Sequence, residues 1–277
     1  MSPGFRRTAL AAIKVLIALA ALGYMGTLAL MYVNQERLIF PGTPLPADYR
    51  FRFDPGQRFE EIRVPVPGAT LDALHFMQDK PRGLVFYVHG NGGNLATWTR
   101  GIDFYRRINY DLFIFDFRGY GKSTGRIESE KQLDADVRAA WDAIAPRYRD
   151  LPIIIQGRSL GTGLAARLAR DVVPRLLVLV SPYTSLAAIG KLEYPFVPEW
   201  LNRYPMRTDA LIGDIKSPIV LIHGTADAVI PFTESERLKK LARAPIELLA
   251  IAGAGHTDRS AAYLDALAKR LIAAAGG

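Results

Sequence analysis

The stretch PIIIQGRSLGTGLAARLAR, residues 152–170, holds a Gly-x-Ser-x-Gly motif between an apolar run and a helical pattern. Residues 152–156 predict a buried strand, and residues 162–170 predict a helix that starts directly after the motif. A tight turn between the two strains the backbone of Ser159, and its flanking glycines let strand and helix approach closely. The Ser159 hydroxyl then points away from the chain, near a helix N-terminus that favours negative charge. The motif therefore predicts a nucleophile rather than a chance glycine-rich turn.

The partners of such a serine lie further along the chain. A hydroxyl is a poor nucleophile until a base removes its proton, and a third group must orient that base. Residues 219–223 read as a buried strand followed shortly by Asp227, and residues 247–251 read as another strand followed by His256. Both side chains come just after the C-terminal ends of apolar strands, where ligands bind in open α/β sheets.

The order serine, acid, histidine is that of the α/β-hydrolase fold. On these three motifs, residues 35–275 resemble the α/β-hydrolase superfamily, and more closely its single-pass, membrane-anchored serine hydrolases of the bacterial esterase or lipase kind. The resemblance implies a mostly parallel, doubly wound sheet with helices on both faces and a small cap. It also implies that Ser159, Asp227 and His256 form a catalytic triad that requires no metal and no organic cofactor.

Two other acids compete with Asp227. Asp258 is only two residues from His256, which is too close along the chain, and Glu234 falls in the next expected helix. Its position directly after a strand favours Asp227.

Acyl transfer develops an oxyanion, which needs preorganised N–H donors. One donor is expected from the backbone of Leu160, the residue after the nucleophile. The other is expected from the glycine-rich stretch 89–94, which follows the first fully buried strand, residues 83–88. The resemblance places this donor at Asn91, although a plain glycine turn is the alternative. His89 reads as a structural histidine that shapes the loop.

The N-terminal segment predicts a membrane span. Residues 15–33 contain no charged residue, and a helix of this length is about 28 Å long, close to the thickness of a bilayer's hydrocarbon core. Arg6, Arg7 and Lys14 precede the run and favour a cytoplasmic N-terminus, which places the domain outside the cytoplasm, in the periplasm if the source is a diderm bacterium. A cleaved signal peptide is the alternative, but the run is long and lacks a clean small-x-small site followed by polar sequence.

We therefore expect a tail and transmembrane anchor over residues 1–33, a linker over 34–58 and the hydrolase domain over 59–277. The linker is rich in proline and aromatic residues and is expected to lie against the domain. Period-two patterns predict an antiparallel hairpin over residues 59–66 and 71–77. Helical spacing predicts four further helices: 97–107, 131–148, 232–244 and 260–274.

A long connection over residues 184–213 follows the strand expected at 176–180. A connection of this length is often a lid or binding loop, and the resemblance places a cap here. Its aromatic residues either line an acyl-binding wall or pack against the core, and the pattern is compatible with both.

Composition narrows the class of function. The chain has no cysteine, which excludes disulfides, a thiolate nucleophile and a cysteine metal site. The net charge of +8 suits a solvated basic surface or attraction to anionic lipid, and no basic run with interleaved aromatics indicates a nucleic-acid partner. Gly121-Lys122-Ser123 resembles the end of a phosphate-binding loop, but Asp116 stands where that motif needs glycine.

These features predict a membrane-anchored serine hydrolase that acts on an acyl ester or thioester and contacts membrane lipid through its N-terminal helix. Two alternatives are a membrane-tethered scaffold that keeps the fold without chemistry, and a peptidase of the same fold.

Overall fold

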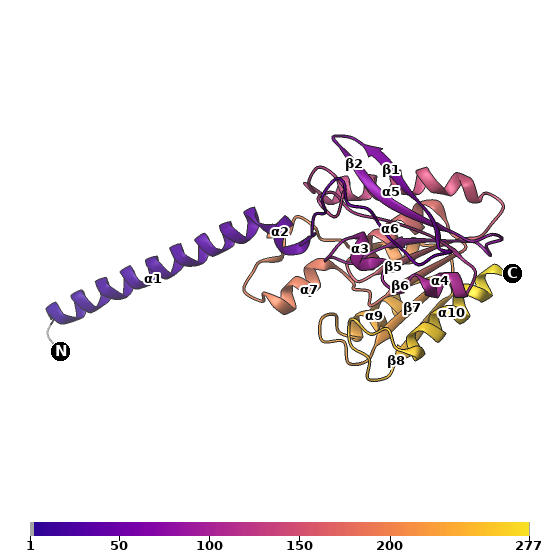
Figure 1. Cartoon of the computed structure of the whole chain (residues 1–277). Coiled ribbons are helices and arrows are strands. Elements are labelled where there is room, and N and C mark those ends of the chain that lie inside the picture. The colour runs from indigo at the N-terminus through magenta and orange to yellow at the C-terminus, as the bar shows by residue number, and fades with distance from the viewer. Residues whose placement is uncertain (1–2, 277) are drawn as a thin grey trace.

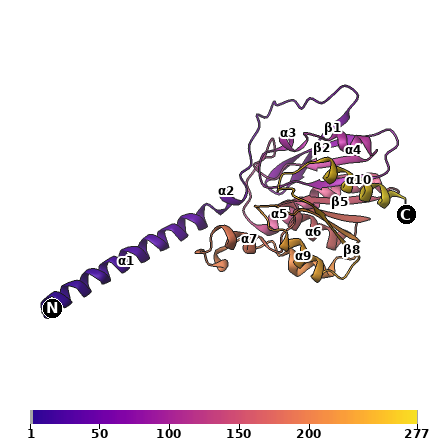
Figure 2. The same ribbon diagram turned by 90° about the horizontal axis from the view of Figure 1, so that it is seen from below.

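The computed structural model describes residues 3–276, so Met1, Ser2 and Gly277 of the expected tail and domain lie outside the described residues. A long helix, α1 (Pro3–Val33), projects from an α/β domain, and a short helix, α2 (Gln35–Ile39), follows it after a turn at Asn34. The far end of α1 and the C-terminus lie on opposite sides of the molecule (Figures 1 and 2).

The domain is built on an eight-stranded sheet with the order β1-β2-β4-β3-β5-β6-β7-β8. The pairs β1–β2 and β2–β4 are antiparallel, and the other five pairs are parallel. The strands are β1 (Arg58–Val66), β2 (Ala69–Met77), β3 (Leu84–Val88), β4 (Asp111–Phe115), β5 (Ile153–Arg158), β6 (Leu176–Val180), β7 (Ile219–Gly224) and β8 (Ile246–Ile251). This confirms the predicted mostly parallel sheet and its opening hairpin.

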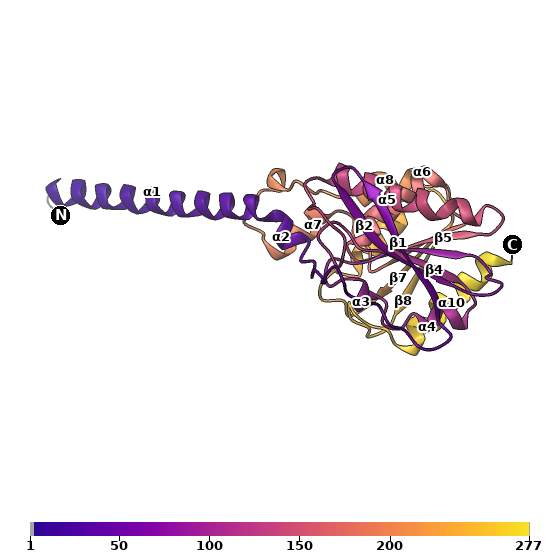
Figure 3. The same cartoon turned by 45° about the horizontal axis from the view of Figure 1, so that its top comes forward.

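Helices cover both faces of the sheet (Figure 3). One layer contains α5 (Glu130–Ile144), α6 (Gly161–Val172), α8 (Thr208–Leu211) and α9 (Thr233–Leu241). The other contains α3 (Leu95–Trp98), α4 (Asp103–Arg107) and α10 (Ala261–Ala275). The short 3₁₀ helices η1 (Ala145–Tyr148), η2 (Glu199–Leu201) and η3 (Ile212–Asp214) complete the connections.

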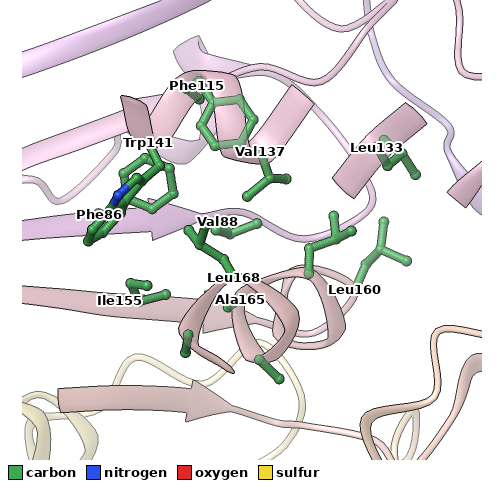
Figure 4. Close-up of a cluster of buried hydrophobic side chains, with 14 of the residues drawn as sticks. Phe86, Val88, Phe115, Leu133, Val137, Trp141, Ile155, Leu160, Ala165 and Leu168 are labelled. Carbon is green, nitrogen blue, oxygen red and sulfur yellow. The ribbon is translucent and has the colours of Figure 1, made fainter. Parts of the chain in front are cut away.

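The central strands are apolar on both faces because both faces are covered. Along β3, Phe86 and Val88 face the layer of α5 and α6, whereas Val85 and Tyr87 face the layer of α10. Figure 4 shows the first of these layers, where side chains of α5 and α6 such as Val137 are directed toward β3. Because successive side chains of a strand point to opposite faces, the sheet has one hydrophobic core on each face.

The prediction of one continuous helix over residues 97–107 is wrong. The chain forms two short helices, α3 and α4, separated by a turn at residues 99–102. Gly101 lies in that turn at φ +88°, a backbone conformation that no helix continues through. The helical spacing of apolar residues in this stretch therefore comes from two separate short helices, α3 and α4, which both pack on the sheet.

Residues 34–58 lie against the domain, as predicted from their aromatic content. Phe40 and Phe51 are buried, one in each core. Isolated parallel bridges join Gly42 to Gly93 and Pro44 to Gly121. The segment therefore leads from the end of α1 directly past the C-terminal edge of the central strands.

Candidate active site

Ser159 occupies the turn between β5 and α6 with a φ of +50°, in the left-handed region that non-glycine residues rarely adopt. Two glycines allow this turn to form. A Cβ on Gly157 would lie 2.6 Å from the Cβ of Ala165, and one on Gly161 would lie 2.3 Å from the carbonyl oxygen of Val88. Only glycine therefore lets α6 lie this close to the strands, and the close approach holds Ser159 above the edge of the sheet.

The structure brings Ser159, His256 and Asp227 together from three separate strand ends. The Nε2 of His256 lies 3.0 Å from the Oγ of Ser159, and its Nδ1 lies 2.8 Å from the Oδ2 of Asp227. Asp227 follows β7 and His256 follows β8, which are neighbours in the sheet. This geometry allows a proton to pass from the hydroxyl to the imidazole while the carboxylate orients the ring.

The carboxylate of Asp227 is held in its charged form. Its Oδ1 accepts hydrogen bonds from the backbone N–H groups of Val229 and Ile230, at 2.9 and 2.8 Å. Burial alone raises the pKa of Asp227, but hydrogen bonds from His223, His256 and the Ile230 backbone outweigh burial and hold the pKa far below its usual range. A negative charge beside the imidazole would stabilise an imidazolium if His256 accepted a proton.

The competing acids are engaged elsewhere. The Oδ2 of Asp258 accepts a 2.7 Å hydrogen bond from the hydroxyl of Ser260. The Oε2 of Glu234 accepts a 2.8 Å hydrogen bond from the backbone N–H of Thr184. Their positions leave Asp227 as the acid beside the histidine.

The two expected oxyanion donors border the same cavity as Ser159 and His256. Leu160 is the residue that precedes α6, and N–H groups at a helix start have no acceptor within the helix. The carbonyl oxygen of Asn91 accepts a 2.6 Å hydrogen bond from the hydroxyl of Tyr120, which fixes the loop. His89 is buried with its Nδ1 2.7 Å from the carbonyl oxygen of Gly90, in keeping with a structural role.

A cavity of about 480 Å³ opens beside these residues. Part of the connection 184–213 forms one side of it, through α7 (Leu186–Glu193) and η2. The two alternatives for its aromatic residues both occur, because Tyr194 lines the cavity while Tyr204 is fully buried. Residues of α2 and of the end of α1, including Leu28 and Met31, also line the cavity.

Sequence reasoning missed three contributors to this site. Tyr183 is buried under the elbow, where its hydroxyl donates a 2.9 Å hydrogen bond to the carbonyl oxygen of Leu160. Arg158 donates a hydrogen bond to the backbone of His256. The end of α1 forms part of the cavity, and because residues 15–33 are apolar on every face, the sequence did not indicate which of them would do so.

Comparison with known proteins agrees with this architecture. The profile of the family described as serine aminopeptidase, S33, matches residues 79–207. Uncharacterized protein Rv2307c of Mycobacterium tuberculosis is 31% identical over 249 residues, which cover 87% of each chain. Alpha/beta hydrolase domain-containing protein 17B of Homo sapiens is 36% identical over 183 residues, covering 63% of this chain and 60% of that protein. The chain belongs to the α/β-hydrolase superfamily.

Solved structures share the fold of this α/β hydrolase. The Pyrococcus furiosus esterase Pf2001 superposes with a TM-score of 0.64 at 20% identity, covering 85% of this chain and 97% of the esterase. A membrane phospholipase A, titled as a bacterial virulence factor, superposes with a TM-score of 0.64 at 17% identity over 98% of this chain and 100% of its own. At such identities the likeness establishes the fold.

Proposed function

We propose that this hydrolase is a membrane-anchored serine hydrolase that cleaves carboxylic esters or thioesters through an acyl-enzyme. The observation that carries the proposal is the hydrogen-bonded series from Ser159 through His256 to Asp227, beside a largely apolar cavity that Ser159 and His256 line. An unreactive scaffold of this fold has no need to keep a strained serine within 3.0 Å of a histidine that is itself oriented by a charged carboxylate.

Each residue has a role in the proposed reaction. Ser159 attacks the acyl carbonyl while His256 takes its proton, and the backbone N–H groups of Leu160 and Asn91 stabilise the oxyanion. His256 then protonates the leaving alcohol or thiol as the carbonyl re-forms. Water attacks the acyl-enzyme in the same way, with His256 again as the base, and releases the carboxylic acid.

The anchor is part of the proposal. Residues 10–33 form a helix that is long and apolar enough to cross a membrane, a property that a signal sequence shares. Lys14 lies near the start of this span, and Tyr24 and Tyr32 lie toward the domain, as interfacial residues do. We place the domain on the extracytoplasmic side because Arg6 and Arg7 precede the span.

Labelling with a serine-directed fluorophosphonate tests the function. Wild-type protein should be labelled and should hydrolyse esters, whereas Ser159→Ala should do neither while keeping its thermal unfolding temperature. Ser129→Ala is the matched control, since Ser129 is an exposed serine at the start of α5. Persistent labelling of Ser159→Ala would refute the nucleophile. Faster turnover of aminoacyl amides than of esters would favour the peptidase.

A further inference from the structure

The end of the N-terminal helix and the catalytic serine border one cavity, which a simple tether does not explain. We propose that the segment Leu28–Ile39 is one wall of the acyl-chain site, so that the acyl chain of a membrane lipid ester enters the cavity from the bilayer along α1. This inference rests on the proposed function and adds to it the source of the substrate and the residues that select its chain length.

The first observation is a stripe on the helix. Leu28, Met31, Tyr32 and Gln35 line the cavity at the three- and four-residue spacing that puts side chains on one helix face. Leu28 is only 6% exposed, whereas Leu30, two residues on, is 67% exposed. The end of α1 is therefore docked by one face, while its other face remains open for contact with lipid.

Hydrogen bonds from residues of α2 to the cap connection hold the end of α1 in this position. The side-chain amide of Gln35 donates to the carbonyl oxygen of Leu201 at 2.7 Å and accepts from the backbone N–H of Arg203 at 2.9 Å. Glu36 accepts a 2.7 Å hydrogen bond from the hydroxyl of the buried Tyr204 and lies 2.8 Å from the guanidinium of Arg203. These bonds join α2 to residues 201–204 of the cap connection, so helix and cap form one unit.

A second contact lies about three helical turns before Gln35, further from the domain. The hydroxyl of Tyr24 donates a 2.7 Å hydrogen bond to the carbonyl oxygen of Phe196 in the cap connection. Tyr24 precedes Leu28 by four residues and shares its face of the helix. The cap connection thus bonds to both ends of the stretch from Tyr24 in α1 to Gln35 in α2.

The cap side of the cavity is apolar and ends in an exposed apolar lip. Leu186, Ile189 and Val197 of the cap connection line the cavity. Beside them Trp200 is 80% exposed, and Phe196 is also exposed at the level of Tyr24. Figures 1 and 3 show α7 beside α2 and the domain end of α1. Tyr24 lies inside the stretch that can span a membrane, so if α1 crosses a bilayer the lip dips into the adjacent leaflet, where apolar side chains such as tryptophan and phenylalanine are stabilised.

Together these contacts define a route for the substrate. The apolar cavity reaches from the end of α1 and from Tyr194 and Val197 of the cap connection to Ser159 and His256. An acyl chain that moves along this route stays in contact with apolar surface and does not have to cross water. Each methylene it buries improves binding by roughly fourfold. The side chains of Leu28, Met31 and Leu38 should therefore set the preferred chain length.

A pair of tryptophan substitutions tests the wall in the full-length protein, embedded in phospholipid nanodiscs. Met31→Trp fills the cavity, whereas Leu30→Trp places the same bulk on the open face of the helix. Rates on nitrophenyl esters from acetyl to palmitoyl are expressed per active site, titrated with a short-chain fluorophosphonate. We expect the ratio of lauroyl to acetyl turnover to fall at least tenfold in Met31→Trp and to stay at the wild-type value in Leu30→Trp. Equal profiles for the two variants would overturn the proposal.

A covalent probe gives an independent readout with the wild-type protein. A fluorophosphonate with a long alkyl chain and a terminal diazirine bonds to Ser159, and light then attaches the chain end to whatever it touches. We expect peptide mass spectrometry to find the attachment within residues 28–39. Attachment confined to other segments would overturn the proposal while leaving the hydrolase intact. Absence of labelling in the wild type would instead refute the proposed function.

Discussion

The guanidinium Nη2 of Arg158 donates a 2.8 Å hydrogen bond to the carbonyl oxygen of His256. Arg158 is buried at the end of β5, one residue before Ser159, and its guanidinium also lies 5.7 Å from the ring centre of Tyr263. The bond therefore joins the loop that carries His256 to the strand that precedes Ser159. A contact of this kind fixes the position of His256 without touching the substrate.

We predict that Arg158→Gln lowers kcat at least tenfold and leaves the chain-length profile unchanged. The shorter amide cannot reach the His256 carbonyl, and a displacement of about 1 Å in a catalytic group can cost about 100-fold. Arg158→Lys keeps a long donor and should recover part of the activity. Steady-state kinetics on one ester, with thermal unfolding measured in parallel, checks this. Loss of stability with unchanged kcat would mean that Arg158 supports only the fold.

We predict that Asp227→Asn lowers turnover by about 10⁴-fold, the scale seen when a triad carboxylate becomes an amide and the histidine takes the wrong tautomer. Fluorophosphonate labelling should slow in parallel because it uses the same base. Asp258→Asn is the matched control, since its carboxylate bonds to Ser260 instead. An inactive Asp258→Asn beside an active Asp227→Asn would reverse the assignment of the acid.

The fold could be predicted because its signals are local. Gly157 and Gly161 flank Ser159 in a turn where any larger side chain at the two glycine positions would clash with neighbouring atoms. The apolar strands on either side of this turn can be recognised from their own sequence, without knowledge of their partners in the sheet. The prediction of a single helix at residues 97–107 was wrong because it, too, rested on a local pattern. Apolar spacing continued through Gly101, but the glycine adopts a positive φ and ends the helical path.

The expected site residues come together in the structure, whereas the rest of the pocket was not predictable from local pattern. An apolar stretch that can span a membrane looks alike on every face, so nothing in residues 15–33 distinguishes Leu28 from Leu30. Only the tertiary contact with the cap buries one and exposes the other. Arg158 was overlooked because its partner, the backbone of His256, has no sequence signature.

We predict that the titration of Asp72 lowers the stability of the domain as the pH rises from 5 to 8. Burial, and next the neighbouring Glu61 carboxylate, raise the pKa of Asp72 to about 7 in the folded state. An unfolded aspartate has a pKa of about 4, so between these values the unfolded chain releases a proton that the folded chain keeps. The contribution of Asp72 to stability is therefore full below about pH 4 and is lost as the pH rises through 7.

Asp72→Asn removes this titration and should be more stable than the wild type at pH 8. The difference in free energy of unfolding should widen by about 2 kcal/mol between pH 5 and pH 8. Thermal or urea unfolding at the two pH values measures it. Asp79→Asn is the control, since the Asp79 side chain is 91% exposed and paired with Arg58. A difference that is equal at both pH values would exclude Asp72 as the titrating group.

We predict that the hydrolase domain faces away from the cytoplasm. Arg6, Arg7 and Lys14 lie at the start of the N-terminal helix, whereas Arg37 is the one basic residue close behind it, and basic residues are retained on the cytoplasmic side. In a diderm bacterium, alkaline phosphatase fused to the C-terminus should be active and green fluorescent protein in the same place should be dark. The opposite pattern would contradict the orientation.

A soluble, shortened product in the periplasm would show that the helix is cleaved as a signal sequence. The hydrolase would then lose the wall that Leu28 and Met31 form.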